Sequence, residues 1–131
     1  MEKRLKDFLK EYDGRVIPLS KASELASWNA NITGSDSDLT KSEKASYALE
    51  RFYTDRNGFL ELKAIKGSGL VEDSLLSRQL DLIYNLYLGG QVDTSLIAQR
   101  LKMETEINRE YLNFRAKVNN KELTDNQVRD T

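Results

Sequence analysis

The chain has 131 residues, of which 39% are hydrophobic and 31% charged, and its net charge is −1. This length suits one domain or one part of a larger domain. The 20 basic and 21 acidic residues are mixed along the chain, so no basic block predicts a nucleic-acid or membrane-surface partner. Apolar runs are short, and no membrane-spanning segment is predicted.

Histidine and cysteine are both absent from the sequence. The lack of cysteine excludes disulfides and thiolate metal sites, and it leaves the redox compartment undetermined. The lack of histidine excludes Ser-His and Cys-His catalytic pairs, and histidine-based zinc or di-iron sites. We therefore expect no catalytic residue, no metal ligand and no cofactor in this chain.

The first periodic stretch covers roughly residues 2–30, where apolar residues recur at steps of three and four, as on one face of a helix. They are Leu5, Phe8, Leu9, Tyr12, Val16, Leu19, Ala22 and Ala26. Pro18 lies inside this stretch and costs about 3 kcal/mol, because it removes a hydrogen bond and clashes with the residue four positions back. That residue is Gly14, the least bulky neighbour. The pattern predicts one kinked helix, with two shorter helices as the alternative.

A polar linker, TGSDSDLTKSE, precedes the second predicted helix, for which Ser37 or Asp38 is the expected cap. We expect this helix to end at the glycines of residues 66–69. Its apolar stripe consists of Ala45, Leu49, Phe52, Phe59, Leu62 and Ile65. The third predicted helix has a wide apolar face, which we expect to be buried on more than one side. That face consists of Leu75, Leu76, Leu80, Leu82, Ile83, Leu86 and Tyr87.

Asp93 or Thr94 is the expected cap of a fourth helix. Its stripe consists of Ile97, Leu101, Met103, Ile107, Tyr111, Phe114 and Val118. No useful strand-period alternation is present. The sequence therefore predicts an all-α fold of four long antiparallel helices in a single helical region, residues 1–131.

The last residues carry the start signal of a fifth helix. Thr124 and Gln127 have the spacing of a capping box, and Leu123 and Val128 that of a hydrophobic staple. An isolated helical turn has little stability, yet the sequence stops at Thr131. We therefore expect the helix to continue, and the chain to be an N-terminal piece of a larger protein.

The segment WNANIT, residues 28–33, holds the only tryptophan and permits several interpretations. Asn31-Ile32-Thr33 is a glycosylation acceptor pattern. Alternatively, Asn29 and Asn31 end the first helix, because asparagine tolerates the left-handed conformation. Trp28 would then be a packing anchor at the junction of helix and loop rather than a ligand platform.

Two segments carry a family resemblance. FLKEYDGRVIPLSKASELASWNANIT, residues 8–33, resembles the opening helix of the angiotensin-converting-enzyme family of zinc peptidyl-dipeptidases. LNFRAKVNNKELTDNQVRD, residues 112–130, resembles the segment before the next helix in bacterial members. The order of the helices between them also fits, so the resemblance covers nearly the whole chain.

The resemblance implies a mostly helical metallopeptidase whose N-terminal helices form a lid over a deep substrate channel. The family releases dipeptides from peptide C-termini with a zinc held by His-Glu-x-x-His and a downstream glutamate. None of these ligands is in this chain, so zinc is expected only in the parent enzyme. By position near the shared triplet, Trp28, Asn29 and Asn31 are the expected substrate-binding residues, and Asn29 is the preferred contact.

Two functional hypotheses follow. In the first, the chain is the substrate-channel lid of such a peptidase and is inactive alone. Its partners would be the remainder of the parent and the peptide substrate, with self-association when it is isolated. In the second, it is a self-contained, non-enzymatic helical interaction module. The resemblance favours a periplasmic or secreted location, with a cytoplasmic one as the alternative.

Overall fold

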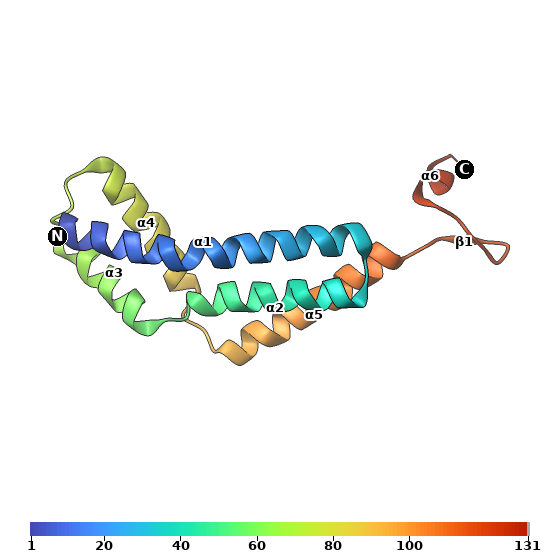
Figure 1. The fold of residues 1–131 in the computed structure, drawn as a ribbon, viewed down its shortest axis with the longest axis horizontal. Coiled ribbons are helices and arrows are strands. Elements are labelled where there is room, and N and C mark those ends of the chain that lie inside the picture. Colours follow the sequence, from blue (N-terminus) through green and yellow to red (C-terminus); the bar gives the residue numbers. More distant parts are fainter. Residues whose placement is uncertain (131) are drawn as a thin grey trace.

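The computed structural model of the protein describes residues 1–130, most of which lie in helices (Figure 1). The elements are α1 (Glu2–Thr33), α2 (Asp36–Phe52), α3 (Arg56–Ser68), α4 (Ser74–Gly89), α5 (Thr94–Asn113), β1 (Lys117–Val118), β2 (Lys121–Glu122) and α6 (Asp125–Arg129). The predicted all-α class is confirmed. Among the described helices, none combines the length and the apolar character that crossing a membrane requires.

Helix α1 is a single helix of 32 residues that runs through Pro18, as predicted in preference to two helices. It ends at Gly34, which adopts the left-handed conformation with φ 59° and donates its N–H to the carbonyl of Ala30. Asn29 and Asn31 lie inside the helix, so the interpretation that they end it is wrong. Glycine reaches the left-handed conformation without the steric cost that asparagine carries, and the helix continues until it meets one.

The second predicted helix is two helices, α2 and α3, separated at residues 53–55. The break follows from a local cap, because the Asp55 carboxylate accepts a hydrogen bond from the N–H of Asn57 and starts α3. Phe52 and Phe59 stand seven residues apart on either side. The helical spacing of apolar residues therefore continues across the break, and for that reason the sequence does not reveal it.

The cap of α2 is Ser35 rather than Ser37 or Asp38. Its hydroxyl oxygen accepts the N–H of Asp38, the residue three positions later. Asp93 caps α5 through the N–H of Ser95, which agrees with one of the two predicted caps. The capping box of Thr124 and Gln127 is present at the start of α6, as predicted.

Helix α5 ends at Asn113, five residues before the predicted limit at Val118. Beyond it the chain forms a short antiparallel pair, in which Val118 in β1 lies opposite Lys121 in β2. Asn119 and Asn120 connect the strands with φ of 52° and 62°, as in a tight hairpin turn. Asparagine is one of the few residues that accept this conformation. The Asn-Asn pair was therefore the sequence signal for a hairpin.

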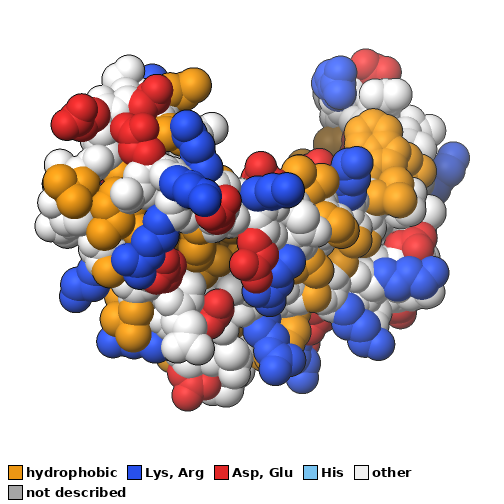
Figure 2. Space-filling view, turned by 60° about the vertical axis from the view of Figure 1, so that its left-hand side comes forward, with side chains coloured by type: hydrophobic (Ala, Val, Ile, Leu, Met, Phe, Trp, Pro, Cys, Tyr) orange, Lys and Arg blue, Asp and Glu red, His pale blue; other side chains and the backbone are white. Residues whose placement is uncertain are grey.

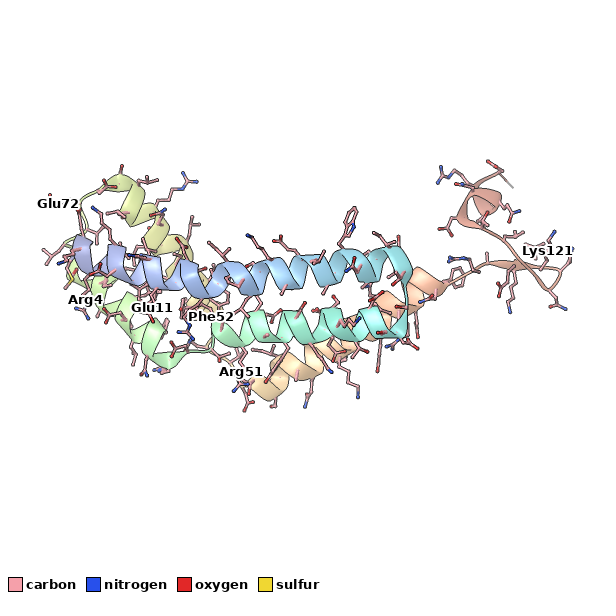
Figure 3. All side chains as sticks on the ribbon, viewed as in Figure 1. Arg4, Glu11, Arg51, Phe52, Glu72 and Lys121 are labelled. Atoms are coloured by element: carbon pink, nitrogen blue, oxygen red, sulfur yellow. The ribbon has the colours of Figure 1, made fainter. Side chains whose placement is uncertain are left out.

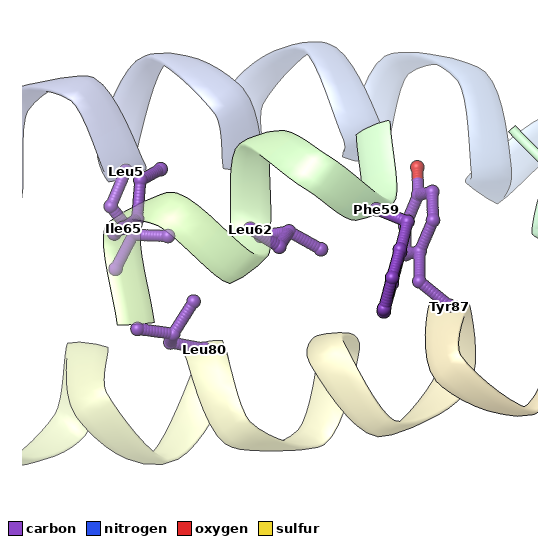
Figure 4. Packing of buried hydrophobic residues seen from close by; sticks show 6 residues of the cluster. All are labelled: Leu5, Phe59, Leu62, Ile65, Leu80 and Tyr87. Atoms are coloured by element: carbon purple, nitrogen blue, oxygen red, sulfur yellow. The ribbon is translucent and has the colours of Figure 1, made fainter. Parts of the chain in front are cut away.

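Two packed groups of helices share α1 (Figure 1). The N-terminal half of α1 packs against α3 and α4 around the apolar cluster shown in Figure 4. The buried residues of this cluster are Leu5, Phe59, Leu62, Ile65, Leu80 and Tyr87. Helix α2 lies antiparallel to the C-terminal half of α1, and α5 packs on α2. Leu39 in α2 and Ile97 and Leu101 in α5 are buried there.

The contact between α1 and α2 is made largely by small side chains. The hydroxyl oxygens of Ser23 and Ser46 lie 3.2 Å apart, and those of Ser27 and Ser42 lie 3.0 Å apart. Small side chains allow two helices to approach closely, and each serine pair satisfies its own hydrogen bonding. This seam fixes the orientation of the C-terminal half of α1.

Asp73 is expected to be a measurable determinant of α4 stability. Its carboxylate accepts the N–H groups of Leu75 and Leu76, each at 2.9 Å. Asp73→Ala should lower the free energy of unfolding by about 1 kcal/mol, measured by urea denaturation. Asp73→Asn retains an accepting oxygen and should cost only a few tenths of a kcal/mol. Equal losses in both variants would show that the cap is not the cause.

Candidate functional site

Trp28 lies on the outer surface of α1, where 66% of its side chain is exposed. Leu25 and Ile32 are exposed as well. They stand three residues before and four residues after Trp28, which places all three side chains on one face of the helix. The interpretation of Trp28 as a packing anchor is therefore wrong, because its indole faces solvent.

Asn29 and Asn31 are also exposed on α1. At about 100° per residue they lie on opposite sides of the stripe formed by Leu25, Trp28 and Ile32. The structure thus brings the three predicted site residues onto one surface, which we name the Trp28 face: Leu25, Trp28, Asn29, Asn31 and Ile32. It has an apolar centre with an amide on each side, and each amide offers both donors and an acceptor.

The turn after α1 ties the Trp28 face to α2. The Thr33 hydroxyl donates to the Asp38 carboxylate at 2.7 Å, and the Ser35 hydroxyl donates to the same carboxylate at 3.1 Å. These two hydrogen bonds hold the pKa of Asp38 below its usual value. Asn113 from α5 donates to the carbonyl of Gly34 at 2.9 Å. Together with the serine seam, these bonds hold the end of α1 in place.

A second exposed apolar surface covers α4 and α5. On α4, Leu75, Leu82 and Leu86 are exposed, while Leu80 and Tyr87 are buried. The prediction that the wide face of α4 is buried on more than one side is therefore wrong for this chain. The reason is that α5 turns away to pack on α2, which leaves one side of α4 open to solvent.

The predicted stripe of α5 is divided between two faces of the helix. Ile97 and Leu101 pack on α2, whereas a neighbouring stripe faces solvent. That exposed stripe consists of Leu96, Met103, Ile107, Tyr111 and Phe114. A hollow of about 530 Å³ lies between the end of α4 and the start of α5, lined partly by Leu86, Val92 and Leu96. Figure 2 shows hydrophobic side chains at the surface among charged ones, with a depression between two raised parts of the molecule.

An aromatic cluster joins α1, the end of α2 and α4. The hydroxyl oxygens of Tyr12 and Tyr53 lie 2.6 Å apart, and the Tyr87 ring packs edge-on against Tyr53. Burial is the main cause that raises the pKa of Tyr12 well above its usual value and that of Tyr87 to about 12. Both side chains therefore remain protonated and neutral over the physiological pH range.

Within residues 1–130, no group of three or more acidic residues is arranged to hold a metal ion. Several acidic side chains instead pair with basic ones at the surface. Arg4 pairs with Glu61, Lys66 with Asp81, Arg100 with Glu50 and Arg109 with Asp36. Each pair joins two different helices, and each exposed pair contributes about 0–1 kcal/mol.

No protein-family model matches the chain, and neither a curated protein nor a solved structure matches it.

Proposed function

We propose that the chain is the N-terminal lid region of a zinc peptidyl-dipeptidase similar to the angiotensin-converting-enzyme family, and that it is inactive alone. The observation that carries the proposal is the Trp28 face. It lies in residues 8–33, the segment that resembles the opening helix of that family. Its exposed indole is flanked by Asn29 and Asn31, as suits a surface that contacts extended peptide.

The chemistry expected of this face is binding and selection. Asn29 and Asn31 can each donate to a peptide carbonyl and accept from a peptide N–H. The Trp28 ring offers a flat apolar surface for a side chain of the substrate. The remainder of the parent would supply the zinc, which activates water for attack on the scissile carbonyl. The role of this chain would be to narrow the channel, so that unfolded peptides enter and folded proteins do not.

The exposed stripes of α4 and α5 support the same proposal. Contiguous apolar surface on a water-soluble helix is typical of a contact with another protein surface, and its burial is worth about 25 cal/mol per Å². We assign these stripes to the contact with the remainder of the parent. The expected arrangement leaves the Trp28 face toward the channel.

The first test is the gene sequence downstream of Thr131. We expect a His-Glu-x-x-His motif within a few hundred codons, and an immediate stop codon would overturn the proposal. The product of the whole gene should then release dipeptides from the C-terminus of an unstructured peptide, and a zinc chelator should abolish the release. The 131-residue chain alone should release none.

Trp28→Ala in the whole gene product tests the Trp28 face itself. Loss of the indole should raise KM by up to about tenfold, measured by steady-state hydrolysis of an unstructured peptide. The thermal midpoint should be unchanged, because the side chain is exposed. Lys10→Ala on the same helix is the matched control. An unchanged KM in Trp28→Ala would remove this residue from the site.

The second hypothesis, a self-contained interaction module, is favoured by the local completeness of the fold. A side chain caps the start of each of the helices α2 to α5. In addition, no buried side-chain nitrogen or oxygen atom in the described chain is without a hydrogen-bond partner. Under this hypothesis the stop codon would follow Thr131, and the stripes of α4 and α5 would bind a separate protein.

A further inference from the structure

A cavity of about 300 Å³ lies where α1, α3, α4 and the end of α2 meet. Four aromatic rings line it, from Phe8, Tyr12, Phe52 and Tyr87. Their centroids lie 6.1 Å apart for Phe8 and Tyr87, 5.8 Å for Tyr12 and Phe52, and 6.0 Å for Phe52 and Tyr87, with the rings inclined to one another. In Figure 3, Glu11 and Phe52 mark this junction on α1 and α2. At these separations the tilted rings contact one another directly, and together they form one aromatic wall of the cavity, drawn from three helices.

Two carboxylates at the cavity are available to a ligand. Glu11 and Asp55 both line it, and neither forms an ion pair within residues 1–130. Asp55 uses one carboxylate oxygen to cap α3 through the N–H of Asn57, and no hydrogen bond to a described residue engages its other oxygen. The third carboxylate, on Glu61, is held by two hydrogen bonds from Arg4. Arg15 also lines the cavity, so the protein balances the negative charge of Glu11 and Asp55 only in part and without a direct ion pair.

The Tyr87 hydroxyl gives a second polar feature inside the cavity. The side chain is only 3% exposed, but its hydroxyl oxygen is not sealed from solvent: it lines the cavity and forms no hydrogen bond to another residue of 1–130. In Figure 4 its oxygen points toward α1. Charge interactions with Asp55 and Glu11 add to burial in raising the pKa of Tyr87, which agrees with a hydroxyl close to both carboxylates. This oxygen can accept a hydrogen bond from a ligand.

Because Gly58 has no side chain, the Tyr87 ring can lie directly against it. A Cβ atom at this position would lie 2.8 Å from Cε1 of Tyr87, closer than carbon atoms approach without displacement. Glycine at the start of α3 thus lets the ring lie deep in the junction, with its hydroxyl at the cavity.

A cation of the protein already lies against the aromatic wall. The guanidinium carbon of Arg15 lies 4.9 Å from the centroid of the Phe52 ring, within the range of a cation–π interaction. Arg15 also forms no ion pair within residues 1–130. The wall therefore has the geometry that holds a positive charge, and Arg15 is a competitor for it.

We propose that this cavity binds a small organic ammonium cation, which lies against the aromatic wall and is balanced by Glu11 and Asp55. Aromatic faces bind ammonium groups with energies that rise as water is excluded, and carboxylates add charge attraction. The volume lies at the lower end of that of small-molecule sites, so it selects a compact ligand. The site is separate from the Trp28 face and does not depend on the peptidase proposal.

Choline is the probe, and 3,3-dimethylbutan-1-ol is its uncharged carbon isostere. Each is titrated into the 131-residue chain, and binding is followed by calorimetry and by the ring resonances of Tyr12 and Tyr87. Choline is expected to shift both resonances and to bind at least about tenfold more tightly than the isostere, which corresponds to about 1.4 kcal/mol. Equal affinities for choline and its isostere would show that the cavity binds apolar groups without regard to charge, and this would overturn the proposal. The absence of choline binding would overturn it as well.

Variants separate a ligand site from a structural junction. Glu11→Gln and Asp55→Asn should each weaken choline binding by about three- to tenfold, and Asn at position 55 retains the ability to cap α3. Glu24→Gln is the matched control, because Glu24 is an exposed glutamate of α1 that does not line the cavity. It should leave the affinity for choline unchanged. Arg15→Gln should tighten binding severalfold, because it removes the competing cation. Weaker binding in Arg15→Gln, or equal losses in Glu24→Gln, would overturn the assignment.

Discussion

Leu62→Ala is expected to lower the free energy of unfolding by about 3 kcal/mol. Leu62 is 0% exposed and lies in the cluster that joins α1, α3 and α4 (Figure 4). Truncation removes buried methyl groups and leaves a cavity that neighbouring helices fill only in part, and such changes cost about 2–5 kcal/mol. Domains of this size are stable by only about 5–15 kcal/mol. The loss is measured from urea denaturation followed by circular dichroism.

Leu60→Ala is the matched control on the same helix. Leu60 is 45% exposed, so less apolar area returns to water and no closed cavity forms. We expect a loss below about 1 kcal/mol. Equal losses from Leu60 and Leu62 would contradict the arrangement in which α3 turns Leu62 toward α1 and α4.

Gly90→Ala is expected to lower the free energy of unfolding by about 2–3 kcal/mol, the upper part of the range for overpacking a close contact. A Cβ atom on Gly90 would lie 2.5 Å from the carbonyl oxygen of Tyr53 and 2.7 Å from the Tyr53 Cβ. Backbone atoms cannot rotate away as a side chain can. The same carbonyl also accepts a hydrogen bond from Gln91 at 3.0 Å, which a displacement would weaken. The thermal midpoint and the urea midpoint should both fall.

Gly89→Ala separates this contact from the general effect of glycine. A Cβ on Gly89 meets no atom within 4 Å, and Gly89 is the last residue of α4. Alanine should therefore be neutral or stabilising by up to about 1 kcal/mol. Gly90 has φ −83°, which alanine adopts freely, so backbone conformation does not explain a loss at that position. Similar results for both glycines would refute the close approach of Tyr53.

The helical class and several helix ends could be predicted because they depend on local chemistry. Asp93 and Thr124 start helices through hydrogen bonds within three residues, and Gly69 ends α3 in the left-handed conformation with φ 65°. The break between α2 and α3 was missed because Phe52 and Phe59 keep the same apolar period on both sides. The spacing of apolar residues indicates that they share one face. It does not indicate whether the helix is interrupted between two of them.

Burial and the cavity could not be predicted in the same way. Ile97 and Ile107 are both apolar residues on α5, but only Ile97 meets α2. The direction of α5 relative to α4 decides which apolar stripe of α5 another helix covers. The spacing of apolar residues in the sequence does not predict that direction. The residues of the Trp28 face could be predicted because they are neighbours in the sequence. Glu11, Asp55 and Tyr87 belong to distant segments, so only the packed fold places them at one cavity.

Because α1 is one continuous helix, it connects the two packed groups of helices mechanically. One end is fixed to α3 and α4, and the other is fixed to α2, with no interruption of the helix at Pro18. At 1.5 Å per residue, the distance along the axis from Tyr12 to Trp28 is about 24 Å, and a tilt of about 10° at Tyr12 would displace Trp28 by about 4 Å. Because the serine pairs tie this half of α1 to α2, a small tilt at the aromatic junction would move the Trp28 face and α2 together, by about the width of one side chain.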